Sequence, residues 1–386
     1  MEIESEEKKR EESNSIDHVI SWILLLYAGI VTSFISPIVL IVLFYSASPL
    51  MLISTECRKI VMRILARASN LQFITCVRIA GIKGNRMEFG FRNLFLFPVM
   101  MSGENLDRLS DCRALLLPNH LSLFDHFIFM TAADSFGINA VGRWIFVIYN
   151  MWIYTPLGWL WSSYGNYFID SVPIHKREET LSHLRRHFDR IYHDVDLRWV
   201  CLYPEGSRLF LIQKRNSEYE KKKGLPQLTH CAYPRLGAAL SAIKVLGPDP
   251  KDPSKANNGR GPPLKYLVDV TLGYPDGKIL PFKDIFMSAL LNGGGKPYAI
   301  HYEIFDMDPK WSDEEELRKF LFDRYQQKVS IQNSFDKLLD SYYKTGSFSS
   351  DSKEAPLPSD VIIIGFQLLQ IALFAIITKF LYSSIF

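Results

Sequence analysis

Two long apolar segments, one near each end of the printed sequence, limit the folds that are open to this chain. Residues 19–53 are nearly free of charge, and residues 361–386 are interrupted only by Lys379. A bilayer core is crossed by about 20 apolar residues in a helix, so both segments predict membrane insertion. The first segment is too long for one ordinary span and too short for two. It forms either one long helix kinked at Ser36-Pro37, or two half-length helices that enter and return.

The segments between these two apolar stretches differ in character. We divide the chain into a polar tail at 1–18, a membrane segment at 19–54, a basic amphipathic helix with its lead-in at 55–108, a central domain at 109–305, a helical extension at 306–348, a linker at 349–360 and a second membrane segment at 361–386. The basic helix carries Arg58, Lys59, Arg63 and Arg67 among apolar residues. Such a helix beside a membrane segment indicates the cytoplasmic side and contact with anionic headgroups; an ordinary surface helix is the alternative.

Composition excludes some classes of protein. The net charge of +3 is too small to indicate nucleic-acid binding, and mean hydropathy slightly above zero fits contact with lipid. The five cysteines include no Cys-x-x-Cys pair, so they are expected as free thiols in a reducing compartment. No Asn-x-Ser/Thr sequon occurs, which fits a central domain that faces the cytosol.

The apolar run at 114–117 predicts a buried strand, and His120 lies in the connection that follows it. Ser122 and Asp125 are spaced like a capping box for a helix that ends near Ala133. The Asp125 carboxylate, in the first turn, would then reach back to the His120 imidazole. An imidazole held at one nitrogen keeps the other free to accept a proton, as a general base does. The alternative is that Asp125 only caps its helix.

Aromatic residues crowd the next part of the chain. Residues 139–143 predict a short strand ending in Arg143, and the aromatic residues of 144–167 could line a pocket, lie at the lipid–water interface or pack the core. Residues 165–170 predict a glycine turn into a short strand. An amphipathic helix is expected at 176–192.

A second polar motif follows a second buried strand. The strand at 199–203 runs into Pro204-Glu-Gly-Ser-Arg208. Glycine lets the backbone approach a phosphate and arginine binds its oxygens, so this is a candidate anion site; a plain surface turn is the alternative. Residues 214–223 are basic and expected to be flexible. Arg235 lies near a further glycine turn, which opens a helix through Leu246.

The rest of the chain alternates between strands and helices. We expect a loop at 247–263, strands at 266–272 and 298–305, a helix from a capping box at Ser312 to Lys328, and a helix at 334–344.

Three motifs follow one another between the two membrane segments: Asn119-His120-x4-Asp125, Gly165-x2-Phe-Ile-Asp170 and Pro204-Glu-Gly-Ser-Arg208. In this order and spacing they resemble the glycerolipid acyltransferase family, the enzymes related to lysophosphatidate acyltransferase. The resemblance covers roughly residues 109–305. Further pairs bring the chain closer to the branch of lysophosphatidylglycerol and lysocardiolipin acyltransferases: Pro234-Arg235, Tyr274-Pro275 and His301-Tyr302. The resemblance implies an α/β fold with a mixed central sheet flanked by helices, and membrane helices at both ends.

The resemblance also implies residue roles. His120 is the base, Asp125 orients it, residues 165–169 help to bind the acceptor, and residues 205–208 hold its phosphate. The substrate-binding candidates are Asn119, Ser122, Arg143, Gly165, Phe168, Ile169, Asp170, Glu205, Gly206, Ser207, Arg208 and Arg235. Two positions depart from the family pattern, because Ser171 replaces a frequent arginine and Ser207 a threonine. The first departure shifts the phosphate contact onto Arg208, Arg143 or Arg235.

The implied reaction transfers an acyl group from acyl-CoA, as co-substrate, to the free hydroxyl of a lysophospholipid. His120 would accept the hydroxyl proton, a step typically worth about 10²–10⁴-fold in rate. Backbone amides at the start of the Ser122 helix would stabilise the oxyanion. The absence of Gly-x-Ser-x-Gly argues against a lipase.

We expect no cofactor and no metal, because His120, Asp125 and His126 lack a convincing ligand set. The expected location is the endoplasmic reticulum membrane with the catalytic domain facing the cytosol; no nucleic-acid partner is expected, and nothing indicates an oligomeric state. One alternative is a neutral acceptor such as monoacylglycerol, which would leave Arg208 without a phosphate. The other is a catalytically silent lipid-binding protein, against which the intact His120, Asp125, Glu205 and Arg208 speak.

Overall fold

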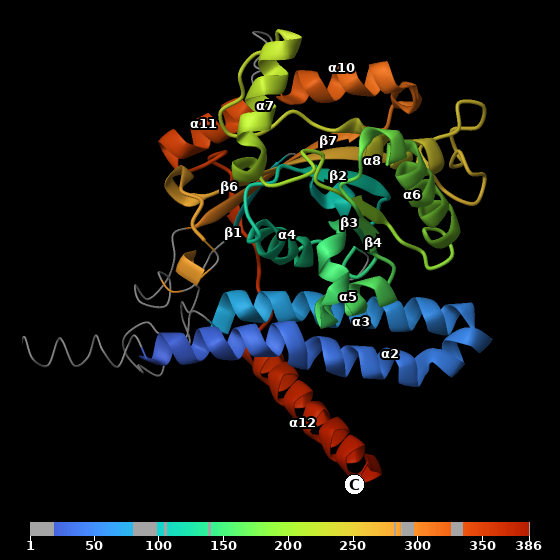
Figure 1. Cartoon of the computed structure of the whole chain (residues 1–386), viewed down its shortest axis with the longest axis vertical. Helices are drawn as coiled ribbons and strands as arrows, with labels where there is room; N and C mark the ends of the chain where they lie inside the picture. Colours follow the sequence, from blue (N-terminus) through green and yellow to red (C-terminus); the bar gives the residue numbers. More distant parts are fainter. Residues whose placement is uncertain are drawn as a thin grey trace, which may run out of the picture.

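A mixed β-sheet lies at the centre of the chain (Figure 1). The computed structural model describes residues 19–79, 99–103, 106–137, 140–281, 283–285, 287, 297–325 and 335–385, so the predicted tail at 1–18 lies outside the described residues. Among these residues an eight-stranded sheet has the order β4-β3-β5-β2-β6-β7-β1-β8. The strands are β1 (Val99–Gly103), β2 (Ala114–Pro118), β3 (Trp144–Tyr149), β4 (Tyr167–Ile169), β5 (Trp199–Cys201), β6 (Tyr266–Gly273), β7 (Tyr298–Asp306) and β8 (Lys353–Glu354). The predicted α/β class with a mixed sheet is confirmed.

The direction of the strands determines at which edge of the sheet the sequence motifs lie. The strands β4, β3, β5, β2 and β6 are parallel neighbours, whereas β7 runs antiparallel to β6. Their carboxyl ends therefore meet at one edge of the sheet, where ligands bind in open α/β folds. The central strands β2 and β5 are fully buried, which explains their continuous apolar runs. The strand predicted at 139–143 is wrong: Arg143 N donates to Ala140 O in a turn, and β3 begins one residue later.

Helices cover both faces of the sheet. The helix α4 lies between the sheet and the long helix α3, while α8 packs against both α6 and α10 (Figure 1). The bounds are α4 (Asp125–Asp134), α5 (Pro156–Ser163), α6 (Arg177–Ile191), α7 (Leu209–Lys223), α8 (Leu236–Leu246), α10 (Glu314–Tyr325) and α11 (Phe335–Thr345). The helices predicted at 176–192, 236–246 and 334–344 are confirmed. The helix predicted to reach Lys328 is described only as far as Tyr325.

The basic segment at 214–223 forms a helix, so its predicted flexibility is wrong. It belongs to α7, and its Glu220 is buried. Glu220 Oε1 accepts hydrogen bonds from Asn216 Nδ2 at 2.7 Å and from Leu228 N at 3.0 Å. Gly224 then ends the helix in the left-handed conformation, with φ of 65°. The buried carboxylate thus anchors a helix whose lysines stay in water.

The first apolar segment is one continuous helical run from Val19 to Ile53, 35 residues long. A π-helical turn at Val31–Ile35 precedes Pro37 and absorbs the break, and α2 (Ser36–Ile53) continues the run. Two half-length helices are thereby excluded. Ser54 links α2 to α3 (Thr55–Ile79), and the two helices lie side by side beneath the domain (Figure 1).

The second apolar segment forms α12 (Asp360–Ile385), which leaves the domain beyond this helical pair (Figure 1). By length and composition, Val19–Ile53 and Val361–Ser384 are each able to cross a membrane. Buried amides join α12 to α3. Gln72 Oε1 accepts hydrogen bonds from Gln367 Nε2 at 2.8 Å and Gln370 Nε2 at 3.1 Å, and Gln72 Nε2 donates to Thr32 at 3.0 Å.

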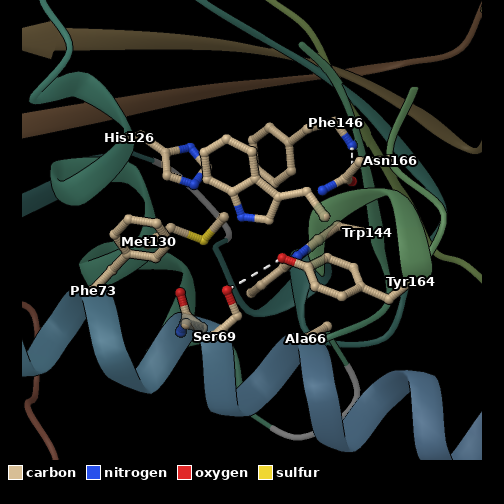
Figure 2. A pocket seen from close by; sticks show the side chains of 11 residues that line it. Ala66, Ser69, Phe73, His126, Met130, Trp144, Phe146, Tyr164 and Asn166 are labelled. Carbon is tan, nitrogen blue, oxygen red and sulfur yellow. Dashed lines mark hydrogen bonds between the residues drawn. The ribbon is translucent and has the colours of Figure 1, made fainter. Parts of the chain in front are cut away.

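The aromatic stretch at 144–167 divides between two environments. Trp144, Trp161 and Tyr164 are buried in the layer between α3 and the sheet, where Tyr164 donates to Ser69 at 3.3 Å (Figure 2). Tyr154 and Trp159, in contrast, are 81% and 59% exposed. Some aromatic residues of this stretch therefore pack in the core, and others lie on the surface.

Candidate active site

The loop after β2 is held at the carboxyl edge of the sheet by Asn119. The Asn119 side chain is fully buried; its Nδ2 donates to Leu272 O at 3.2 Å and its Oδ1 accepts from Leu272 N at 2.7 Å. These bonds fasten the start of the loop to β6. Asn119 is thus placed to position His120 rather than to contact a substrate.

His120 and Asp125 come together as their spacing predicts. His120 Nδ1 lies 2.8 Å from Asp125 Oδ2, and the Asp125 side chain is fully buried whereas that of His120 is 21% exposed. The same carboxylate oxygen accepts from Leu121 N at 2.7 Å and Ser122 N at 3.0 Å. His120 Nε2 has no partner among the described residues, so it is the nitrogen left to accept a proton.

The turn between His120 and α4 differs from a capping box. The N-cap of α4 is Phe124, which makes no side-chain cap bond, and Ser122 Oγ accepts from Phe124 N at 3.2 Å. The Asp125 carboxylate serves the imidazole and the turn backbone, so Ser122 shapes the turn instead of capping the helix.

Two tyrosines complete the surroundings of this pair. Tyr274, just after β6, is fully buried and donates from its hydroxyl to Asp125 Oδ1 at 2.6 Å. The ring of Tyr203 stacks on His120, with centroids 4.3 Å apart and an interplanar angle of 28°. Neither tyrosine had a role predicted from the sequence. Their positions directly after β5 and β6, at the edge that carries His120, were the available signal.

Glu205 is turned inward, not toward a substrate phosphate. Its side chain is fully buried; Oε1 accepts from His120 N at 2.9 Å and Oε2 accepts from Ala232 N at 2.9 Å. Burial raises the pKa of this carboxyl to about 8, although the two N–H donors act against the rise. Glu205 therefore joins the His120 loop to the segment before α8. The residues left for the expected phosphate contact are those next to Glu205.

The neighbours of Glu205 do form a basic surface. Gly206 has φ of 72°, a conformation that favours glycine, and a Cβ there would crowd Arg235 Cδ at 3.0 Å. Arg208 lies over the exposed ring of Phe210 at 5.1 Å. Ser207 is partly exposed between them. The structure thus brings Gly206, Ser207, Arg208 and Arg235 together, beside the loop of His120.

The second motif runs along another strand, and only its last residues reach this edge of the sheet. Gly165, with φ of 102°, turns the chain into β4, which contains Phe168 and Ile169 and precedes the exposed Asp170. The strands β3 and β5 separate β4 from β2. No contact with His120 is seen among the described residues, so this motif forms a separate part of the edge.

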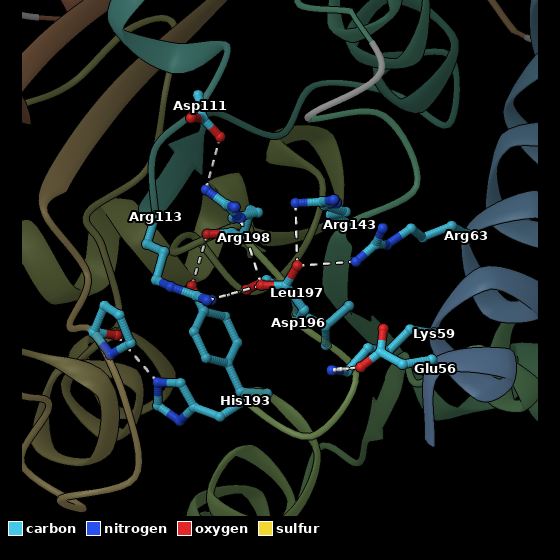
Figure 3. Close-up of polar contacts among 12 residues, drawn as sticks. Glu56, Lys59, Arg63, Asp111, Arg113, Arg143, His193, Asp196, Leu197 and Arg198 are labelled. Atoms are coloured by element: carbon cyan, nitrogen blue, oxygen red, sulfur yellow. Dashed lines mark hydrogen bonds and ion pairs between the residues drawn. The ribbon is translucent and has the colours of Figure 1, made fainter. Parts of the chain in front are cut away.

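Arg143 lies at the opposite edge of the sheet. It precedes β3, and its Nη1 lies 3.1 Å from Asp196 Oδ2 (Figure 3). Arg63 and Arg113 also pair with Asp196, each at 2.9 Å. Because His120 follows the carboxyl end of a parallel strand, the domain separates the two residues, and Arg143 does not join the candidate site.

The ion pair between Arg63 and Asp196 also affects which residues of α3 face outward. The predicted helix is present, but Arg63 points to Asp196 of the domain, while Ile60 and Ile64 are 52% and 59% exposed. The acidic loop around Asp196 draws the arginine inward. The outer side of the helix therefore combines apolar residues with the exposed Arg67, while Arg63 is engaged by the domain, and contact with anionic headgroups stays a prediction.

His126 is separated from the catalytic pair. Its ring is packed edge-on against Phe73, Phe146 and Trp161, and Nε2 has no partner among the described residues (Figure 2). Burial lowers its pKa to about 4, with a smaller contribution from His120. No group of three His, Cys, Asp or Glu able to hold a metal is found within the described ranges.

An imidazole held by a carboxylate at the carboxyl edge of an α/β sheet is an arrangement that transferases and hydrolases use to activate a hydroxyl. Comparison with known proteins narrows this class. Residues 99–244 match the acyltransferase family model. A Caenorhabditis elegans protein provisionally named a 1-acyl-sn-glycerol-3-phosphate acyltransferase is 41% identical over 249 residues, 64% of this chain and 61% of that protein.

Two mammalian relatives point to the same family. Acyl-CoA:lysophosphatidylglycerol acyltransferase 1 of Mus musculus is 28% identical over 262 residues, 65% of this chain and 66% of that protein. The Homo sapiens protein of the same name is 25% identical over 299 residues, 75% and 77% of the two chains. Residues 99–244 therefore carry an acyltransferase domain, and the chain is a homologue of proteins named as 1-acyl-sn-glycerol-3-phosphate and lysophosphatidylglycerol acyltransferases. The match spans less than two thirds of the nematode relative.

Proposed function

We propose that this protein transfers an acyl group from acyl-CoA to the free glycerol hydroxyl of a lysophospholipid. The observation that carries the proposal is the 2.8 Å contact between His120 Nδ1 and Asp125 Oδ2, which leaves Nε2 unpartnered among the described residues. The acyltransferase match at 99–244 and the names of the mammalian relatives support the reaction class and the type of acceptor.

In this mechanism His120 Nε2 accepts the hydroxyl proton while the hydroxyl oxygen attacks the thioester carbonyl. The new C–O bond forms an ester, the C–S bond breaks, and the imidazolium returns the proton to the departing CoA sulfur. Asp125 keeps the imidazole in one orientation and stabilises its charged form. Two backbone N–H groups and the Tyr274 hydroxyl in turn hold Asp125, so the carboxylate does not need to reorganise during the reaction.

The proposed oxyanion donors need revision. The amides of Leu121 and Ser122 donate to Asp125, and the amide of Phe124 donates to Ser122 Oγ. Because these three groups are already engaged, the oxyanion contact is proposed for the other amides at the start of α4, those of Asp125 and His126.

The proposed location is the cytosolic face of the endoplasmic reticulum membrane. Two helices are long and apolar enough to insert into lipid. All five cysteines are free thiols, which suits a reducing compartment. Exposed Tyr154 and Trp159 on and beside α5 have the amphipathic character of side chains found at the lipid–water interface.

The test is a product assay on full-length protein in lipid nanodiscs. Oleoyl-CoA is offered with lysophosphatidylglycerol, lysophosphatidate, lysophosphatidylcholine or monoacylglycerol, and products are identified by mass. We expect a diacyl product from a phosphate-bearing acceptor and release of free CoA in equal amount. Exclusive acylation of monoacylglycerol would instead support the neutral-acceptor alternative, and no product from any acceptor would contradict the proposal.

A further inference from the structure

Arginines from three different helices lie near one another: Arg235 beside Gly206, Arg177 beside Gly237, and Arg215 within electrostatic reach of Arg235. Arg177 begins α6, Arg215 lies on α7, and Arg235 is the N-cap residue of α8. Arg235 Nη1 lies 3.3 Å from the position that a Cβ would take on Gly206. Arg177 Nη2 lies 3.6 Å from the equivalent position on Gly237. Glycine at both positions lets the two guanidinium groups lie close to the backbone.

The charges of these three arginines are not paired with carboxylates in the described part of the chain. Among the described residues, none of the three arginines forms an ion pair, whereas Arg185 on α6 pairs with Glu178. Partial burial, followed by the charges of Arg215 and Arg177, lowers the pKa of Arg235. Mutual repulsion of this kind is unfavourable, and a bound anion would relieve it. All three side chains remain accessible to solvent, so an anion can reach them.

The cluster is linked directly to the catalytic loop. Arg235 N donates to Pro204 O at 2.6 Å, and the next residue, Glu205, accepts from His120 N at 2.9 Å. The N-terminus of the 11-residue helix α8, whose N-cap makes no side-chain bond, adds the positive end of a helix dipole. An anion held here would lie beside the loop that carries the base.

We propose that Arg177, Arg215 and Arg235 form a phosphate-binding site that holds a phosphate group of one of the two substrates. This inference rests on the proposed function and supplies the residues for its substrate recognition. Ser171 stands where the family pattern often has an arginine, and the cluster provides guanidinium groups from other positions. Arg177 and Arg215 are new to the site, because neither belongs to the three motifs. The phosphate is offered either by the lipid headgroup or by CoA.

The experiment measures binding, so that it does not depend on turnover. Arg177→Gln, Arg215→Gln and Arg235→Gln are each combined with His120→Ala in the full-length protein in nanodiscs. Arg185→Gln, on the same helix as Arg177 but paired with Glu178, is the matched control. The probes are lysophosphatidylglycerol, monoacylglycerol and oleoyl-CoA.

Each of the three substitutions is expected to raise the Kd of one phosphate-bearing probe about tenfold, the effect of losing one charge-assisted hydrogen bond. Monoacylglycerol binding and the Arg185→Gln control stay unchanged. A loss confined to lysophosphatidylglycerol assigns the site to the headgroup, and a loss confined to oleoyl-CoA assigns it to the donor. Unchanged binding of both probes in all three variants would overturn the proposal. Since no acyl transfer is measured, that result is distinct from a failure of the proposed reaction.

Discussion

The hydroxyl of Tyr274 donates a 2.6 Å hydrogen bond to Asp125 Oδ1, while Asp125 Oδ2 lies 2.8 Å from His120 Nδ1. The two oxygens of one fully buried carboxylate thus face different partners. Tyr274 follows β6 and Asp125 follows β2, neighbouring strands whose carboxyl ends share an edge. The pairing of these strands therefore fixes the orientation of the carboxylate that orients the base.

Replacing Tyr274 by phenylalanine removes this hydrogen bond and leaves the ring in place. We expect kcat for acyl transfer to fall about tenfold, because a looser carboxylate holds the imidazole less well, while KM stays unchanged. Steady-state kinetics with saturating acyl-CoA measures kcat and the KM for the acceptor separately. An altered KM with normal kcat would contradict a positioning role for Tyr274.

Glu205 should make stability depend on pH. Its pKa rises from an ordinary 4.5 to about 8 in the folded state, so between these values the folded protein binds a proton that the unfolded chain has lost. The free energy of unfolding therefore decreases as pH rises through this window. Glu205→Gln, which does not titrate, should lack this decrease. Melting temperatures of both proteins, compared from about pH 5 to about pH 9, measure the difference, and parallel profiles would refute the prediction.

Gln72 should fasten α12 to the helical pair. Gln72→Leu leaves Gln367, Gln370 and Thr32 without this partner in an apolar setting, at a cost of about 1–3 kcal/mol. Gln370→Leu should cost less, because Gln72 keeps its bond to Gln367. Protease cleavage within the linker before α12 reports its detachment. Equal cleavage of the Gln72→Leu variant and the wild type would show that the amides do not hold the helix.

Arg143 should contribute to stability and not to substrate binding. Arg143→Gln removes one of the arginines around Asp196, and we expect a loss of about 1 kcal/mol in the free energy of unfolding. KM for both substrates should remain as in the wild type, in contrast to the effect of changing Arg235. A raised KM without loss of stability would place Arg143 in substrate recognition after all.

Contacts within a few residues could be predicted from the sequence. The apolar run before His120, the turn and the start of the helix at Asp125 all lie within one short segment, so local pattern determined the His120–Asp125 contact. The apolar helical character of Val19–Ile53 followed from its composition, but the choice of one continuous helix over two half-length helices did not, nor did the π-helical turn that precedes Pro37. A break in the helical pattern permits several local geometries, and packing against α3 selects one.

Contacts between distant segments could not be predicted in the same way. The family resemblance implied that Glu205 helps to hold a phosphate, but its burial between the amides of His120 and Ala232 depends on strand order. Arg143 was a candidate for the phosphate contact because Ser171 replaces an arginine of the family pattern. Its true position at the opposite edge follows from the direction of β3, which begins only after it.

The central claim is that His120 accepts the proton of the acceptor hydroxyl. The most direct test is the rate of acyl transfer from labelled acyl-CoA by His120→Ala in nanodiscs, beside His183→Ala, which changes an exposed histidine on α6. We predict that His120→Ala lowers kcat by about 10²–10⁴-fold with an unchanged melting temperature, and that His183→Ala keeps full activity. Wild-type activity in a folded His120→Ala protein would contradict the account.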